Sequence, residues 1–255
     1  MNPTTGVLSD AWDAYTKHWK HLLPIAFIAY VVVGLVSALL ASTLGLIGVL
    51  LAIVISIVGL YLVQGALTEA VADIRDGRAD LSIGDTYRRV TPKLGAIIGA
   101  GLLAGLGIAI GLVLLIVPGL ILLTLWAVII PVIVLENKGV FDSFGRSQQL
   151  VRGHGFSVFG IIVLTFLLLI AFGWVLSLLL SPLPDGVTRF FSDVISGTLT
   201  APFIALTWTM LYYRLVGVEG GAQVPQSQTP LTAGNQPPTA QDQQPPNSQQ
   251  PPSST

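Results

Sequence analysis

The sequence contains no cysteine, so it can form neither a disulfide nor a thiolate metal site. Charged residues are also scarce, at 10% of the 255 positions, against about 25% in ordinary soluble domains. The net charge of -1 offers no basic excess for a nucleic-acid partner. Hydrophobic residues instead make up 53% of the chain, which indicates an integral membrane protein.

Long runs without charge define the predicted fold. The stretches 22–68 and 94–135 are each about twice the ~20 residues that cross a bilayer, so each predicts a hairpin of two helices. The runs 155–184 and 194–213 add two single spans. We therefore predict an all-α integral membrane protein with six transmembrane helices. The predicted spans are 22–43, 45–68, 94–115, 118–135, 156–181 and 191–213.

The basic residues predict the orientation. Of the twelve lysines and arginines, only Arg189 falls on the side of the spans opposite to both termini. By the positive-inside rule, both termini and the two long loops are expected in the cytoplasm. A secretory signal is the competing interpretation of the first span, but the segment before that span carries both signs of charge, unlike a short basic leader.

The composition changes after residue 216. Residues 217–255 are rich in proline, glutamine, serine and glycine and contain no aromatic residue. Such a segment cannot bury enough apolar surface to offset the entropy of ordering. We predict a membrane domain at 1–216 and a disordered cytoplasmic tail at 217–255. Proline pairs in the tail also suit a protein partner that binds polyproline, although a solvated tail is favoured.

An aspartate followed two residues later by an aromatic residue occurs three times: DAW at Asp10, DTY at Asp85 and DSF at Asp142. Around each aspartate, positions -2, +2, +5 and +9 are mostly apolar and form one stripe of a helix. The pattern predicts amphipathic interfacial helices at 7–21, 82–92 and 139–153, each followed by a transmembrane hairpin. The fold is thus expected to be three parallel repeats of interfacial helix plus hairpin.

Six residues of these helices are the candidate interfacial site. We expect the aromatic rings to face lipid at headgroup depth. The aspartates would bind a cation or a basic partner if the three helices converged. Helix capping is the favoured alternative, because carboxylates in a first helical turn are stabilised by the helix dipole. The candidates are Asp10, Trp12, Asp85, Tyr87, Asp142 and Phe144.

Catalytic chemistry has little support in the sequence. No charged residue lies deep in a predicted span, where Gln64 is the most polar candidate. The three histidines, His18, His21 and His154, lie at predicted cytoplasmic ends and belong to no metalloprotease or nucleophile-elbow motif. We therefore expect no enzyme activity, no cofactor and no metal site. The expected partners are membrane lipids, with a protein partner at the cytoplasmic face or tail as a further option.

Glycines recur at four-residue spacing in the third span, as Gly95/Gly99, Gly101/Gly105 and Gly107/Gly111. Such spacing lets helices approach closely. Packing within the chain is favoured over a homodimer face, because five other helices need contacts.

The run LIVPGLILLTLWAVIIPVIVLENKGVFDSFGRSQQLVRGHGF, at 115–156, and the ending LTAPFIALTWTMLYYRL resemble a known family. They are similar to the six-helix membrane domain attached to some bacterial glycerophosphoryl diester phosphodiesterases, and to stand-alone proteins related to that domain. The resemblance covers roughly residues 8–215 and implies a bacterial or archaeal plasma-membrane protein. The phosphodiesterase domain has no counterpart here, so its activity is not implied.

Two functions are consistent with these features. The first is a non-enzymatic scaffold or lipid-interacting membrane module. The alternative is a transporter or channel for a neutral or lipid-like solute through the centre of the repeats. A continuous path lined by Gln64 and the threonines would favour transport, whereas a closed centre would count against it.

Overall fold

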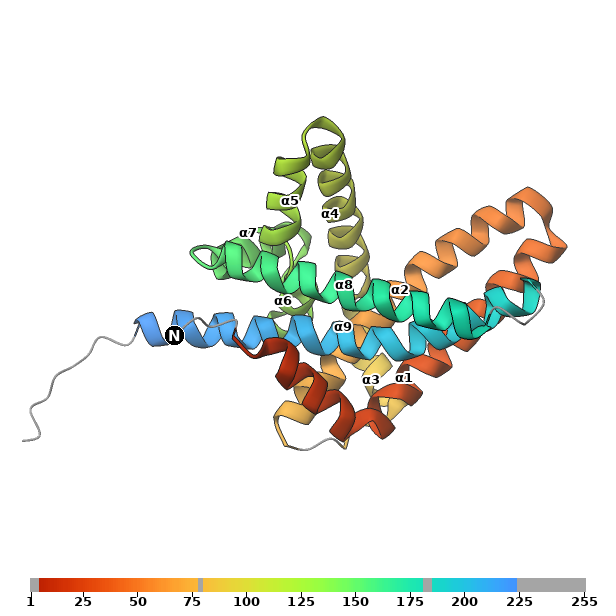
Figure 1. Ribbon diagram of the computed structural model, residues 1–255, viewed down its shortest axis with the longest axis horizontal. Coiled ribbons are helices and arrows are strands. Elements are labelled where there is room, and N and C mark those ends of the chain that lie inside the picture. Colours follow the sequence, from red (N-terminus) through yellow and green to blue (C-terminus); the bar gives the residue numbers. More distant parts are fainter. Residues whose placement is uncertain (1–4, 78–79, 181–184, 224–255) are drawn as a thin grey trace, which may run out of the picture. The chain divides into compact units, whose positions relative to one another are not determined.

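The computed structural model describes residues 5–77, 80–180 and 185–223, and the regular secondary structure among these residues consists of helices (Figure 1). Residues up to Gly221 form one structural unit. In chain order the helices are α1 (Val7–Thr43), α2 (Gly45–Arg75), α3 (Ile83–Val90), the 3-10 helix η1 (Thr91–Lys93), α4 (Leu94–Leu114), α5 (Ile116–Leu125), α6 (Ile129–Glu136), α7 (Val140–Val151), α8 (Gly155–Leu180) and α9 (Asp185–Gln223).

Six helical segments are long and apolar enough to cross a membrane, which confirms the predicted all-α fold with six spans. These segments are Val7–Thr43, Gly45–Arg75, Ile83–Leu114, Ile116–Glu136, Gly155–Leu179 and Val194–Glu219. The first part of α1, before His18, precedes its membrane-spanning part, α3 precedes α4 and α7 precedes α8. The structural equivalence of three repeats stays a prediction.

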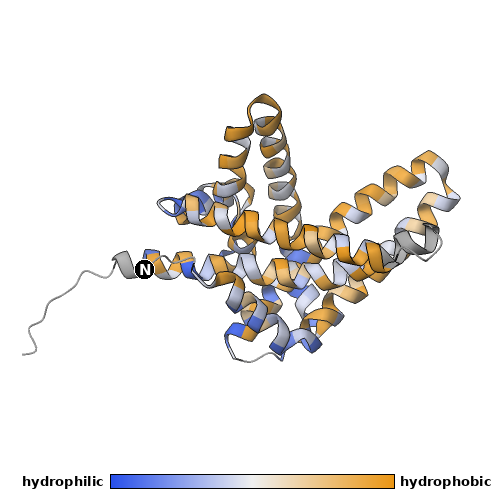
Figure 2. Cartoon of the chain, viewed as in Figure 1, coloured by the Kyte–Doolittle hydropathy of each residue, from blue (hydrophilic) through white to orange (hydrophobic). Residues whose placement is uncertain are grey.

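Two hairpins turn within apolar sequence. Helices α1 and α2 meet at Leu44, and α4 and α5 meet at Leu115. Next to the second turn the backbones nearly touch, since a Cβ on Gly111 would lie 2.9 Å from the Gly119 Cα. Side chains near these turns are largely exposed, including Leu46 at 76% and Val113 at 86%. The hairpin ends are correspondingly apolar in Figure 2, as expected for surfaces that contact lipid.

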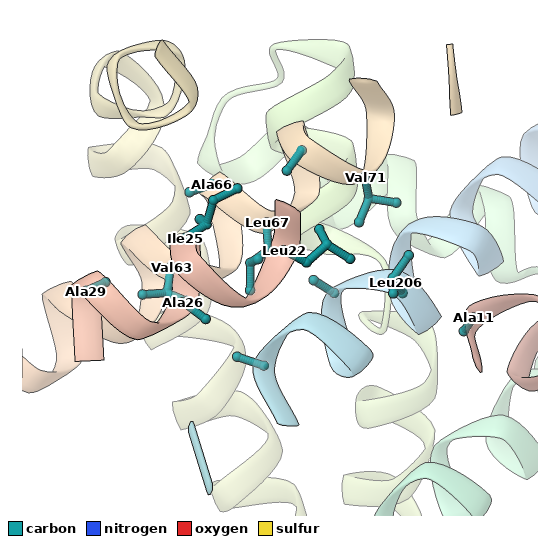
Figure 3. Packing of buried hydrophobic residues seen from close by; sticks show 13 residues of the cluster. Ala11, Leu22, Ile25, Ala26, Ala29, Val63, Ala66, Leu67, Val71 and Leu206 are labelled. Atoms are coloured by element: carbon teal, nitrogen blue, oxygen red, sulfur yellow. The ribbon is translucent and has the colours of Figure 1, made fainter. Parts of the chain in front are cut away.

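The core lies at the opposite end of the hairpins, which we call the base. One cluster joins α1, α2 and α9 through Leu22, Ile25, Leu67 and Leu206, whose side chains face one another in Figure 3. A second cluster joins α6 to α7, α8 and α9, and a third joins α3, α4 and α6. Apolar packing therefore holds the hairpins together at the base, whereas the side chains near their turns are exposed.

Helix α1 is kinked at His18, whose φ of -115° and ψ of 18° are not helical. The kink separates the first part of α1 from its membrane-spanning part. This division falls within the predicted interfacial helix at 7–21, before its predicted end, and the interfacial position of the first part stays a prediction.

The fourth span differs from the prediction of one continuous helix at 118–135. Helix α5 ends at Leu125 and α6 begins at Ile129, with Trp126 and Val128 outside helical geometry. Pro131 has no N–H to donate to the Ala127 carbonyl four residues before it, which weakens the helix at this point. The freed Leu125 carbonyl accepts a 2.8 Å hydrogen bond from the Ser147 hydroxyl of α7.

The C-terminal boundary also differs. Helix α9 runs to Gln223, past the predicted start of the tail at 217. Two hydrogen bonds of 2.8 and 2.7 Å from Arg146 reach the Glu219 carboxylate and hold this extension against α7. Residues 224–255 of the predicted tail lie outside the described part of the chain.

Candidate functional site

The three candidate aspartates lie in different local environments. Asp10 forms an ion pair with Arg214 of α9. The Asp85 backbone N–H donates to the Ser82 hydroxyl, at 3.1 Å, which confirms the predicted cap of α3. Asp142 is exposed in the first turn of α7. Within the described ranges, no three histidine, aspartate or glutamate side chains are placed to hold a metal ion, so the hypothetical cation site at these aspartates is not formed.

Two of the three predicted lipid-facing rings point inward. The Tyr87 hydroxyl donates to the Ile25 carbonyl at 2.7 Å, and its ring packs against the cluster of α1, α2 and α9. Phe144 meets the Trp126 ring edge-on at 4.9 Å between centroids. Only Trp12 stays largely exposed, at 58%. The apolar stripes of α3 and α7 are therefore covered by protein, because the base of the hairpins offers them apolar partners.

Charged residues at the base are joined across helices. Arg146 of α7 donates its Nε to Glu136 of α6, at 3.0 Å to each carboxylate oxygen, and its two terminal nitrogens to Glu219 of α9. The Tyr212 hydroxyl also donates to Glu136, at 3.0 Å. Hydrogen bonding to Glu219, and then to Glu136, raises the pKa of the Arg146 guanidinium above its ordinary value. This arrangement fixes α6, α7 and α9 to one another.

A second ion pair joins α2 to the start of α4. The Lys93 ammonium lies 2.8 Å from Glu69 and also donates to the Val134 carbonyl of α6. From the sequence we attributed these lysines and arginines only to membrane orientation. Their carboxylate partners come from distant segments, so no local motif indicated the pairs.

A cavity of about 260 Å³ lies just inside this charged base, between α2, α4, α6 and α9. We call it the junction pocket. It is lined on its polar side by Tyr61, Gln64 and Thr68 of α2, and elsewhere by Gly105, Trp126 and Trp208 among others. The structure thus places Gln64, the most polar predicted candidate, where the hairpins meet. The sequence did not identify the two tryptophans, since aromatic residues in a span carry no signal of which cavity they line.

Glycines of α4 shape the junction pocket. A Cβ on Gly101 would lie 2.2 Å from the Tyr61 ring, and one on Gly107 would lie 2.8 Å from the Trp126 ring. These glycines thus serve packing within the chain, as predicted. Gly101 and Gly107 make room for the aromatic rings of Tyr61 and Trp126. Gly105 has nothing within 4 Å of an added Cβ and leaves the pocket open there.

The hydrogen-bonding groups of the junction pocket are uncharged. Thr68 donates to the Gln64 backbone carbonyl at 2.9 Å, so its hydroxyl is already engaged within α2. The Gln64 side-chain amide brings two donors and an acceptor, and the Tyr61 hydroxyl brings one donor. Across the pocket, the Ala127 carbonyl cannot receive the usual helical bond, because Pro131 occupies the donor position. The pocket is therefore suited to a neutral polar group.

Comparisons with protein-family models, with curated proteins and with solved structures find no match. The resemblance to the membrane domain of the phosphodiesterases stays a prediction.

Proposed function

We propose that this membrane protein is a lipid-interacting module without catalytic activity, which holds the neutral polar part of a membrane lipid in the junction pocket. The observation that carries the proposal is the position of that pocket. It lies between a layer of paired charges and the exposed apolar parts of the hairpins.

The order of polarity along α2 and α4 resembles that of a glycerolipid. Glu69 and Lys93 pair at the base. Gln64 lies five residues before Glu69 in α2, toward the turn of the hairpin, which at 1.5 Å per residue is about 7.5 Å deeper. This is close to the thickness of the polar layer on one side of a bilayer, roughly 5–7 Å. The glutamine amide therefore lies near the depth at which lipid esters give way to hydrocarbon chains.

The pairing of charges decides between a neutral and an anionic ligand group. Lys93 is bound by Glu69, and Arg146 by two glutamates, so these two cations already have carboxylate partners. A phosphate would have to displace those partners. An ester carbonyl or a hydroxyl needs only the Gln64 amide and the Tyr61 hydroxyl, while the rings of Trp126 and Trp208 cover the adjoining chain.

Tryptophan fluorescence tests the proposal. Of the five tryptophans, Trp126 and Trp208 line the pocket, so Trp12, Trp19 and Trp174 are replaced by phenylalanine. In vesicles of phosphatidylcholine brominated next to the ester, we expect strong quenching, relieved more by added dioleoylglycerol than by the same amount of unbrominated phosphatidylcholine. Gly105→Leu should reduce the quenching by filling the pocket.

A matched control is Gly95→Leu, since Gly95 also has free space around its Cβ but does not line the pocket. Equal quenching in both leucine variants would refute lipid binding in the pocket. If Gln64→Leu keeps the preference for dioleoylglycerol, the amide does not recognise the neutral group. Far-UV circular dichroism of each variant shows whether its helices are intact.

Transport of a neutral solute is the second candidate. It is favoured by the break between α5 and α6 beside the pocket, because interrupted spans form substrate sites in transporters. Transport predicts that Gly105→Leu abolishes the efflux of a neutral solute such as glycerol from proteoliposomes, whereas Gly95→Leu does not. Efflux no faster than from protein-free vesicles would exclude it for that solute.

A further inference from the structure

A second cavity, of about 700 Å³, lies among α1, α2 and α9. Five hydroxyl-bearing residues contribute to its lining, and we call it the hydroxyl cavity. They are Tyr30 and Ser37 of α1, Ser56 of α2, and Ser196 and Thr200 of α9. It shares no lining residue with the junction pocket, so the two are independent sites.

Close helix contacts form the walls of the hydroxyl cavity. A Cβ on Gly59 would lie 2.5 Å from Val33, and one on Gly197 would lie 2.6 Å from the Tyr30 ring. The remaining lining is dominated by small side chains such as Ala38 and Ala52. The volume lies within the roughly 300–1,000 Å³ of pockets that bind small molecules.

Internal hydrogen bonds engage the donor of Thr200 and a donor of the Ser37–Ser56 pair, out of the five hydroxyls of the cavity. The Thr200 hydroxyl donates to the Ser196 carbonyl at 2.6 Å. The Ser37 hydroxyl lies 3.4 Å from the Ala52 carbonyl and 3.2 Å from the Ser56 hydroxyl, and its single proton serves one of them. Each hydroxyl has one donor but two acceptor lone pairs. The cavity therefore retains acceptor capacity on Ser37, Ser56 and Thr200.

The surroundings restrict the ligand further. The described residues that line this cavity carry no charge, and a charged group so far inside a span would be costly. Ser56 and Ala38 are exposed on membrane-spanning helices, so a ligand reaches them from the hydrocarbon region. Such a ligand is uncharged, mostly apolar, and able to donate a hydrogen bond.

We propose that the hydroxyl cavity binds a neutral amphiphile with an alcohol head, such as a long-chain alcohol, through donation of its hydroxyl to Ser37, Ser56 or Thr200. An ester or an ether of the same chain length can accept from the Tyr30 or Ser196 hydroxyl but cannot donate to Ser37, Ser56 or Thr200, so it makes one hydrogen bond fewer than the alcohol. The site does not depend on lipid binding in the junction pocket.

Photocrosslinking with two matched probes tests this proposal. The probes are a diazirine-bearing hexadecanol and its methyl ether, which differ only in the ability to donate a hydrogen bond. In phosphatidylcholine vesicles, we expect the alcohol to label peptides of α1, α2 or α9 saturably. Labelling by the ether should be about fivefold weaker, the ratio given by one hydrogen bond of ordinary strength.

Two kinds of variant make the test specific. Ser37→Ala and Ser56→Ala combined with Thr200→Val remove the three proposed acceptors at nearly constant volume and should bring the ratio of alcohol to ether labelling close to one. Ala38→Leu fills the cavity and should reduce labelling by both probes. The control is Ala109→Leu, an exposed position of α4 that lines neither cavity.

Several outcomes would overturn the proposal. Equal labelling by alcohol and ether in the unmodified protein would mean that the cavity takes any apolar chain. Stronger labelling by a phosphatidylcholine with a diazirine in its acyl chain would assign the cavity to bulk lipid. Labelling confined to α4 or α5 would place the alcohol elsewhere. Quenching of Trp126 and Trp208 is measured in parallel, so failure here is distinguished from failure at the junction pocket.

Discussion

Replacing Gly101 by alanine tests the contact that shapes the junction pocket. The added Cβ would lie 2.2, 2.3 and 2.4 Å from Cε1, Cζ and Oη of Tyr61. Ordinary carbon contacts are about 3.5–4.0 Å, so the ring or the helix must shift by roughly 1.5 Å. Such overpacking typically costs about 1–3 kcal/mol.

The same substitution also has a stabilising effect, because alanine has a higher helix propensity than glycine, by up to about 1 kcal/mol. Gly95→Ala brings only this gain in helix propensity, since nothing lies within 4 Å of its added Cβ. The difference in free energy of unfolding between the two variants therefore isolates the overpacking cost. We expect Gly101→Ala to be less stable than Gly95→Ala by about 1–3 kcal/mol.

Unfolding is measured in mixed micelles with increasing dodecyl sulfate, followed by far-UV circular dichroism. If both alanine variants unfold at the same detergent fraction, the Tyr61 ring does not lie against Gly101. Combining Gly101→Ala with Tyr61→Leu provides a check, because removal of the ring should recover most of the lost stability. Without that recovery, the cost arises from a different contact.

Further predictions concern charge, a buried hydroxyl and pH. Arg146→Met leaves two carboxylates unpaired and should cost about 2–3 kcal/mol in the same unfolding assay, whereas Arg88→Met, at an 82%-exposed side chain, should change stability by less than about 1 kcal/mol. Tyr87→Phe should lower the free energy of unfolding by about 0.5–1.5 kcal/mol, because the hydrogen bond to the Ile25 carbonyl is lost. An unchanged free energy of unfolding would place that ring in lipid. Among the described residues that line the two cavities there is no charged residue and no histidine, so bromolipid quenching and alcohol labelling should stay constant between about pH 5 and 8. A change beyond about twofold would implicate another site.

The spans and one helix start were predictable from the sequence. Charge-free runs of sufficient length leave few alternatives to a spanning helix, so all six were identified. Ser82, three residues before Asp85, correctly indicated the cap of α3. The break at Trp126 was missed because the run is uniformly apolar on both sides, although Pro131 was a local signal that the helix lacks a donor there.

The candidate site was only partly predictable. Periodicity identified the apolar faces of α3 and α7, but the same pattern fits a helix that faces lipid and a helix that faces protein. In the structure, Tyr87 and Phe144 face protein. The pair of Arg146 with Glu219 joins residues 73 positions apart. No sequence spacing encodes such a contact, so the extension of α9 beyond residue 217 was not foreseen.

The positions of the paired charges bear on why cavities exist in this protein at all. Arg146 and Lys93 hold helices together at the base, whereas the turns near Leu46 and Val113 are exposed. Hairpins joined at one end leave space between their helices, and an empty space forfeits van der Waals contact on every side. Lipid chains can fill such space, but they leave without partners the Gln64 side-chain amide and the hydroxyl groups that no internal bond engages, and a polar group that is buried unpaired costs about 1–3 kcal/mol. Neutral ligands that hydrogen-bond as well as fill the space remove that cost, which is why the two cavities are expected to select lipids by their uncharged polar groups.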